Sequence, residues 1–292
     1  MKPAAFDYAR PLSLDEACAM LAAAGDDARL IAGGQTLVPL MAMRLARPKQ
    51  LIDIARIPEL AFVRREGDAV AIGATTRQCV LEHDQIVRAD VPLLAKVMPF
   101  VGHTPTRARG TIGGSLANAD PAAEIALVAV TLGATLVYRE GSTAAEIPAS
   151  EFFIGPMMTA LPAAACLVSV RFPIWREASV GTGFHEVSAR KSDFAFAAAA
   201  AQVALDDAGI CRRLALGIGA VTPFPLRLAT KVLEGTRLEP VRVREVVTAA
   251  LADTEPLSDL HASADYRRRV AASLAVRAIN DAHASAGSAH AR

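Results

Sequence analysis

The stretch Gly110-Thr111-Ile112-Gly113-Gly114-Ser115-Leu116-Ala117-Asn118-Ala119-Asp120-Pro121 joins a pair of glycines to hydroxyl and amide side chains. Gly113 and Gly114 carry no Cβ, so the sequence predicts that their backbone N–H groups are open to a ligand. The hydroxyls of Thr111 and Ser115 would add two further donors. The stretch is therefore suited to bind a phosphate.

Two neighbouring features support this interpretation. Asp120 followed by Pro121 predicts the N-cap and first residue of a helix that runs to Leu132 and stops at Gly133. A second Gly-Gly pair lies in residues 30–37, where an apolar strand leads into a turn and then a short helix. Two such turns could hold one diphosphate.

Each stretch alone leaves an ordinary tight turn as an alternative, because Gly-Gly between a strand and a helix is common. Neither stretch matches the G-x-G-x-x-G dinucleotide motif, and the chain contains no G-x-x-x-x-G-K-[ST] sequence. These absences disfavour the two most familiar nucleotide-binding folds. The two stretches together are more specific than either one.

Read jointly, residues 32–37 and 111–121 resemble the FAD-binding medium subunit of molybdenum hydroxylases, the family of carbon monoxide dehydrogenase and xanthine dehydrogenase. The resemblance covers nearly the whole chain. It extends to several shorter matches: Pro39-Leu40-Met41, Arg44-Leu45, Leu51-Ile52-Asp53-Ile54, Ile72-Gly73-Ala74-Thr75, Arg107 and Arg109-Gly110.

The resemblance implies an α+β fold, in which a two-part FAD-binding domain is followed by a C-terminal α+β domain of antiparallel strands and helices. The first part would be a small β-α-β unit and the second a mixed-sheet unit, related to the vanillyl-alcohol oxidase type of flavoprotein. The implied cofactor-binding residues are Ala32, Gly33, Gly34, Gln35, Thr36, Leu37, Thr111, Ile112, Gly113, Gly114, Ser115, Asp120, Glu124, His185 and Phe194.

Phe194 follows Arg190-Lys191-Ser192-Asp193, at a position where relatives often place an aromatic residue against the flavin ring. A well-studied branch of the family has tyrosine there, so phenylalanine keeps the stacking face and loses the hydroxyl. A core aromatic at the start of a strand is the alternative. His185 is a weaker candidate, because a histidine on an alternating strand is more often a surface side chain.

Composition places few further limits on function. The chain has 292 residues, 52% hydrophobic and 21% charged, with a net charge of +1, which gives no reason to expect nucleic acid or a membrane as partner. No signal peptide or membrane-length apolar run is recognisable, so a cytoplasmic protein is expected. The four cysteines lack C-x-x-C spacing, which argues against a metal cluster in this chain.

Local patterns predict the division of the chain: residues 1–56 and 57–176 as two FAD-binding subdomains, 177–282 as a C-terminal domain and 283–292 as a disordered tail. Ser13-Leu14-Asp15-Glu16 is a capping box, and a helix should follow it to Gly25. Thr75 or Thr76 should cap another helix, and a basic loop should carry His103, Arg107 and Arg109. The last helices are expected at 226–233, 241–252 and 265–279.

No arrangement of residues for substrate chemistry is recognisable. The resemblance therefore implies an oxidoreductase subunit whose FAD receives electrons from a small [2Fe–2S] subunit, while a large molybdenum-cofactor subunit oxidises the substrate and the whole forms a dimer of heterotrimers. A nucleotide-binding module without turnover and a self-contained FAD oxidase are the alternatives. The substrate and the electron acceptor are not readable from this chain.

Overall fold

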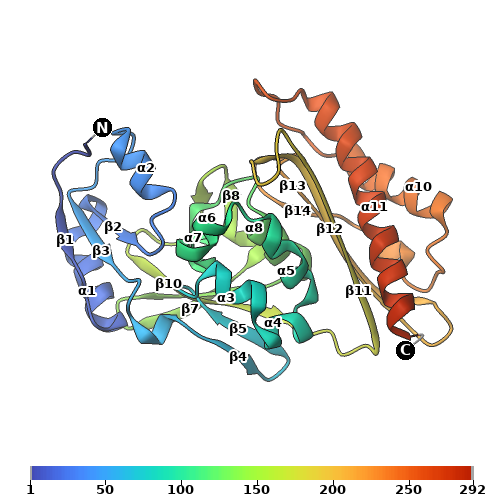
Figure 1. Ribbon diagram of the computed structural model, residues 1–292, viewed down its shortest axis with the longest axis horizontal. Coiled ribbons are helices and arrows are strands. Elements are labelled where there is room, and N and C mark those ends of the chain that lie inside the picture. The colour runs from blue at the N-terminus through green and yellow to red at the C-terminus, as the bar shows by residue number, and fades with distance from the viewer. Residues whose placement is uncertain (1, 291–292) are drawn as a thin grey trace.

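The computed structural model describes residues 2–290, which form three units in sequence order from left to right in Figure 1. Each unit is built on its own sheet, with a three-stranded, a five-stranded and a four-stranded sheet in turn. The predicted mixed α+β fold with a C-terminal domain of antiparallel strands is confirmed.

The first unit is a parallel sheet of order β1-β3-β2 with a helix packed on it. The capping box is confirmed: Ser13 Oγ accepts the N–H of Glu16 at 3.2 Å, and Gly25 ends the helix at a φ of 55°. Buried Leu14, Cys18 and Leu21 face the sheet. The elements are β1 (Asp7–Ala9), α1 (Leu14–Ala24), β2 (Ala28–Ile31), α2 (Leu37–Ala42) and β3 (Gln50–Asp53).

The second unit is an antiparallel sheet of order β4-β5-β10-β6-β7, covered by a group of short helices. Strands β4 and β5 form a hairpin around Gly67. The strands are β4 (Val63–Glu66), β5 (Ala69–Gly73), β6 (Thr135–Glu140), β7 (Thr143–Pro148) and β10 (Ala165–Pro173), with a small β8 (Phe153–Gly155) and β9 (Met158–Thr159) pair beside them. The helices are α3 (Gln78–His83), α4 (Gln85–Asp90), α5 (Pro92–Val97), α6 (Thr104–Arg109), α7 (Ile112–Asn118), α8 (Glu124–Leu132) and α9 (Ala149–Phe152).

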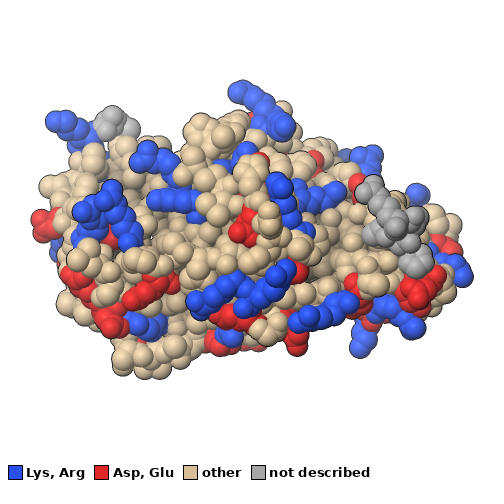
Figure 2. Space-filling model, turned by 60° about the horizontal axis from the view of Figure 1, so that its bottom comes forward, with Lys and Arg blue, Asp and Glu red and all other residues tan. Residues whose placement is uncertain are grey.

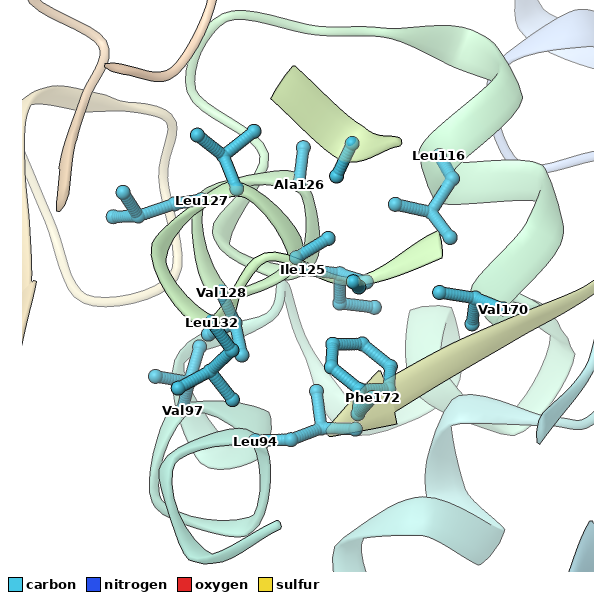
Figure 3. Close-up of a cluster of buried hydrophobic side chains, with 14 of the residues drawn as sticks. Leu94, Val97, Leu116, Ile125, Ala126, Leu127, Val128, Leu132, Val170 and Phe172 are labelled. Atoms are coloured by element: carbon cyan, nitrogen blue, oxygen red, sulfur yellow. The ribbon is translucent and has the colours of Figure 1, made fainter. Parts of the chain in front are cut away.

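Helix α8 lies at the centre of the core of this unit. Residues 125–132 are all buried, because the helix is surrounded by α5, α7, β10 and the C-terminal sheet. Figure 3 shows Ile125, Val128 and Leu132 among Leu94 and Phe172 of neighbouring elements. The helix ends at Gly133 with a φ of 70°, as the sequence predicts.

The third unit is an antiparallel sheet of order β11-β12-β13-β14 between two helical layers. Alternate alanines of β12 face opposite sides, with Ala197 and Ala199 toward α11 and Ala198 and Ala200 toward the second unit. Such small side chains let both layers approach closely. The elements are β11 (Ser179–Ser188), β12 (Ala195–Leu205), β13 (Cys211–Gly219), β14 (Leu226–Arg227), α10 (Pro240–Ala252) and α11 (Ala264–His290).

Several predicted elements are wrong. Residues 226–233 form β14 and a short 3-10 turn in place of a helix, because this segment completes the sheet beside β13. The tail predicted to be disordered is helical from 283 to 290, since buried Ala282 and Ala286 pack on β11; residues 291–292 lie outside the described part. Neither Thr75 nor Thr76 caps α3, because Thr76 Oγ1 bonds Phe62 instead.

Charged side chains are interspersed over the surface. Figure 2 shows Lys and Arg beside Asp and Glu across the face in view, in keeping with the net charge of +1. No helix in residues 2–290 is long and apolar enough to cross a membrane. Nor do those residues contain a group of three or more His, Cys, Asp or Glu side chains placed to hold a metal ion.

Candidate cofactor site

The segment from Gly33 to Thr36 presents free backbone donors. Strand β2 ends at Ile31, the chain reverses at Gly34 with a φ of 68°, and α2 begins at Leu37. Within residues 2–290, the N–H groups of positions 33–36 donate to no other group. Consecutive free N–H groups between a parallel strand and a helix form a concavity that suits an anion.

The structure brings the two glycine-containing stretches together. Gly33 packs against the carbonyl of Arg109 and the Cα of Gly110, where an added Cβ would lie 2.9 Å from the latter atom. Arg77 also donates to the Arg109 carbonyl, and Gln78 N–H donates to the Gly110 carbonyl at 3.0 Å. Gly33 is thus required for the contact between the two stretches, whether or not a ligand is bound.

The second glycine pair does not form an open turn, which corrects the sequence-based prediction. Gly113 and Gly114 lie in the first turn of α7, capped by Thr111. The N–H groups of Ile112 and Gly113 donate to the carbonyls of Thr76 and Ala74 at 3.1 and 2.9 Å, and that of Gly114 donates to Thr111 Oγ1 at 3.0 Å. These N–H groups are therefore bonded within the protein, and they are not open to a phosphate as the sequence predicts.

Two other features of this stretch remain open to a ligand. Gly114 is exposed, and only Thr111 Oγ1 lies near the position of an added Cβ. The hydroxyl of Ser115 on the same helix has no hydrogen-bond partner in the part of the chain described. The stretch thus offers a surface without side chains and a free hydroxyl.

Asp120 does not begin a helix, which is a second correction. Its carboxylate accepts the N–H of Ala122 at 2.9 Å and so closes a separate turn, and α8 begins only at Glu124. The carbonyl of Pro121 accepts the N–H of Ala220 at 2.7 Å, and this hydrogen bond connects the turn to the C-terminal unit. The tertiary contact delays the helix by one turn.

Glu124 lies in a group of carboxylates with raised pKa values. Burial, together with the nearby charges of Glu186 and Asp120, raises the pKa of Glu124 to about 8. Burial also raises the pKa of Glu186 to about 7 and that of Asp120 above its usual range. At neutral pH Glu124 is therefore protonated, and Glu186 is partly protonated, so these two carboxyls can donate hydrogen bonds to a ligand.

His185, a predicted flavin contact, lies on the side of β11 that faces α11. It pairs with Asp281 of α11 at 2.9 Å, on the side of the sheet away from the second unit. Its neighbours Phe184 and Glu186 point to the other side, where Phe184 packs against Phe100 at a ring distance of 4.8 Å. Alternation along β11 therefore selects Glu186, which the sequence-based prediction missed.

Phe194 is 73% exposed, so it is not a core aromatic. Together with Asp120 it lines an open cavity of about 420 Å³ between the turn before α8 and the C-terminal unit. The structure thus places Phe194 and the carboxylate of Asp120 on the walls of one cavity.

Arg107 belongs to a buried ion pair and not to a solvated loop. Its guanidinium donates to both carboxylate oxygens of Glu82, at 2.9 and 3.3 Å, and to the carbonyl of Gly102 at 2.9 Å. The expected basic loop is helix α6, held to α3 by this pair. No sequence pattern indicated Glu82. Its ion pair with Arg107 holds helix α6 and so fixes the position of Arg109 and Gly110 at the end of that helix.

Two family models match this chain in succession. Residues 4–175 match the FAD binding domain in molybdopterin dehydrogenase, and residues 182–282 match the CO dehydrogenase flavoprotein C-terminal domain. The chain therefore belongs to the family of FAD-binding subunits of molybdenum-dependent dehydrogenases. The predicted family, FAD as cofactor and the oxidoreductase class are confirmed.

Relatives of known function are similar over almost their whole length. The carbon monoxide dehydrogenase medium chain of Hydrogenophaga pseudoflava is 35% identical, with 97% of this chain and 99% of the relative covered. The 6-hydroxypseudooxynicotine dehydrogenase complex subunit alpha of Paenarthrobacter nicotinovorans is also 35% identical, with 96% and 95% covered. The names of both relatives mark them as single chains of multi-subunit enzymes.

Solved structures agree with the fold. Carbon monoxide dehydrogenase from H. pseudoflava aligns with a TM-score of 0.93 over 98% of this chain and 100% of that chain. Quinoline 2-oxidoreductase from Pseudomonas putida 86 aligns with a TM-score of 0.91 at 35% identity, over 98% and 99%. The similarity thus extends across enzymes that act on chemically different substrates.

Proposed function

We propose that this chain is the electron-transfer subunit of a molybdenum hydroxylase complex, in which it binds FAD and passes electrons from a partner's [2Fe–2S] clusters to an external acceptor. The observation that carries the proposal is the run of free N–H groups at 33–36, packed against the second glycine-containing stretch. Bound FAD would supply the redox chemistry. The three units correspond in this proposal to two FAD-binding subdomains and a C-terminal domain.

The residues fit an extended dinucleotide that lies across the first two units. The N–H groups of 33–36 suit its diphosphate, while the bare surface of Gly114 and the hydroxyl of Ser115 would contact the same group from α7. Protonated Glu124 and Glu186 would donate to acceptor atoms further along. Phe194 would cover the aromatic ring system.

The proposed function requires two partner subunits. A large subunit with the molybdenum cofactor would oxidise the substrate, and a small subunit would relay electrons through iron–sulfur clusters. The three would assemble as a dimer of heterotrimers. In this proposal the bound flavin alone carries electrons through this chain, whose four cysteines are free thiols.

Gly114→Val tests the proposed contact at the exposed side of α7. Gly114 is an exposed helical glycine whose added Cβ would meet only Thr111 Oγ1, at 2.8 Å, so valine displaces that cap locally and should occupy the ligand's position. We expect FAD affinity to fall by at least about tenfold, or 1.4 kcal/mol. The measurement is titration of FAD into the apoprotein, followed by flavin fluorescence.

Gly287→Val is the control, because Gly287 is also exposed and helical but lies on α11, where an added Cβ would meet no other atom within 4 Å. It should leave the affinity for FAD unchanged. Equal affinity in the Gly114→Val protein would refute the contact at α7. A purified chain that remains colourless after incubation with FAD would refute the proposed function itself.

A further inference from the structure

Arg77 lies between the two glycine-containing stretches. It is the residue before α3, and its backbone forms an antiparallel bridge with Thr111. Its Nη1 donates to the carbonyl of Arg109, and the same carbonyl packs against Gly33. A single carbonyl group therefore holds the guanidinium of Arg77 beside the segment whose N–H groups are free.

Most of the donors of this guanidinium are unused. Apart from the bond of Nη1 to Arg109, the side chain of Arg77 has no hydrogen-bond or ion-pair partner in the part of the chain that the structure describes. An arginine carries five N–H donors, and the side chain of Arg77 is partly exposed, so Nε and Nη2 are accessible to a ligand. Arg107, by contrast, is buried and engaged by Glu82.

The two stretches themselves carry no charge. Residues 30–42 and 110–119 contain no Lys, Arg, Asp or Glu. The N–H groups of 33–36 offer only partial positive charges, whereas each phosphate of a diphosphate carries a negative charge. Such a ligand at this position would be bound more strongly if a neighbouring cation balanced its charge.

Two arginines are close enough in the chain to supply that charge. The side chain of Arg109 is exposed, and no bond within residues 2–290 fixes its position. The side chain of Arg77 is fixed at Nη1 by the Arg109 carbonyl. Because its guanidinium is already ordered, Arg77 loses less conformational freedom when it binds an anion.

We infer that Arg77 binds the diphosphate of FAD, with its free N–H groups on the phosphate oxygens and its positive charge opposite theirs. The inference rests on the proposed function, which places the diphosphate at residues 33–36. A planar guanidinium can donate two parallel hydrogen bonds to a phosphate group. Arg77 is then a cofactor-binding residue outside both glycine-containing stretches.

Arg77→Gln tests this role, because glutamine removes the charge and keeps an N–H donor for the Arg109 carbonyl. We expect the dissociation constant for FAD to rise at least about tenfold at low ionic strength, near 50 mM salt. The difference from the wild type should shrink to less than about threefold near 500 mM salt, since salt screens an exposed charge. The measurement is titration of FAD into each apoprotein, followed by flavin fluorescence.

Two further variants serve as controls. Arg268 is exposed on α11 and donates to the carbonyl of Thr254 at 3.0 Å, so Arg268→Gln removes the same charge and the same kind of bond away from the site. It should leave the affinity for FAD unchanged. Arg77→Lys keeps the charge and should bind FAD within about threefold of the wild type.

Equal FAD affinity in the Arg77→Gln and Arg268→Gln proteins would overturn the inference while leaving the FAD subunit intact. A loss of the same size at both salt concentrations, or in Arg77→Lys, would also overturn it, because Arg77 would then only hold the Arg109 carbonyl in place. So would a wild-type affinity for FAD that does not change with salt, a result that needs no variant. A wild-type chain that binds no FAD would instead overturn the proposed function, and this inference with it.

Discussion

The two glycine pairs look alike in the sequence, but the fold uses them in different ways. At residues 33–34 the glycines leave a run of N–H groups without partners in the described residues 2–290, and at residues 113–114 the same groups are bonded within the protein. The difference arises because α7 lies against β5 and its flanking residues, whereas α2 lies at the edge of a small unit. A Gly-Gly pair can therefore mark either a ligand site or a close approach of two backbones.

Gly113→Ala should have the largest effect on stability. An added Cβ would lie 2.5 Å from the Cβ of Ala74 and 2.6 Å from its carbonyl oxygen, and both atoms are held by the sheet. We expect a loss of about 3 kcal/mol or more in the free energy of unfolding, or failure to fold. Chemical denaturation measures it, with Gly114→Ala as the control. Equal stability of the two variants would contradict the conclusion that Gly113 is closely packed whereas Gly114 is exposed.

Glu124→Gln tests the raised pKa of the buried carboxyl that follows the second glycine-containing stretch. The folded carboxyl titrates at about 8, above the usual value of 4.5, so the folded state keeps a proton that the unfolded state has lost. Stability of the wild-type apoprotein should therefore fall as pH rises from 4.5 to 8. The variant should be more stable than the wild type by about 5 kcal/mol at pH 9 and equal to it at pH 4. A difference that does not depend on pH would contradict the raised pKa.

Thr111→Ala should cost about 1 kcal/mol, because Thr111 Oγ1 caps α7. Ser115→Ala should cost almost nothing, since the Ser115 hydroxyl bonds no described residue. For FAD affinity the order should reverse if Ser115 contacts the ligand directly. Thermal unfolding of the apoproteins and FAD titrations together check both orders. A large loss of stability in Ser115→Ala would show that its hydroxyl also serves the fold.

His185→Ala should have the smallest effect. The His185–Asp281 pair lies on the α11 side of the sheet and is partly exposed, so its loss should cost at most about 0.5 kcal/mol. FAD affinity should not change, whereas Glu186→Ala should lower it. A flavin spectrum altered by His185→Ala and not by Glu186→Ala would mean that β11 has the opposite register.

The sequence alone was sufficient for the family and for much of the local structure. Helix α1 begins after Ser13 and ends at Gly25, and α8 ends at Gly133, because each of these signals acts within a few residues. The parallel pairing of β2 with β3 agrees with the β-α-β unit that the family resemblance implies. These features depend on backbone conformation and capping, which neighbouring residues determine.

Only the tertiary structure decided which polar groups are free. The donors of Gly113 and Gly114 are consumed by Ala74 and Thr111, and the turn at Asp120 is set by the contact between Pro121 and Ala220. The choice of Glu186 over His185 depends on which face of β11 packs against α11. Partners from distant segments settle these questions, because a backbone group is available to a ligand only when no other part of the chain has already bonded it.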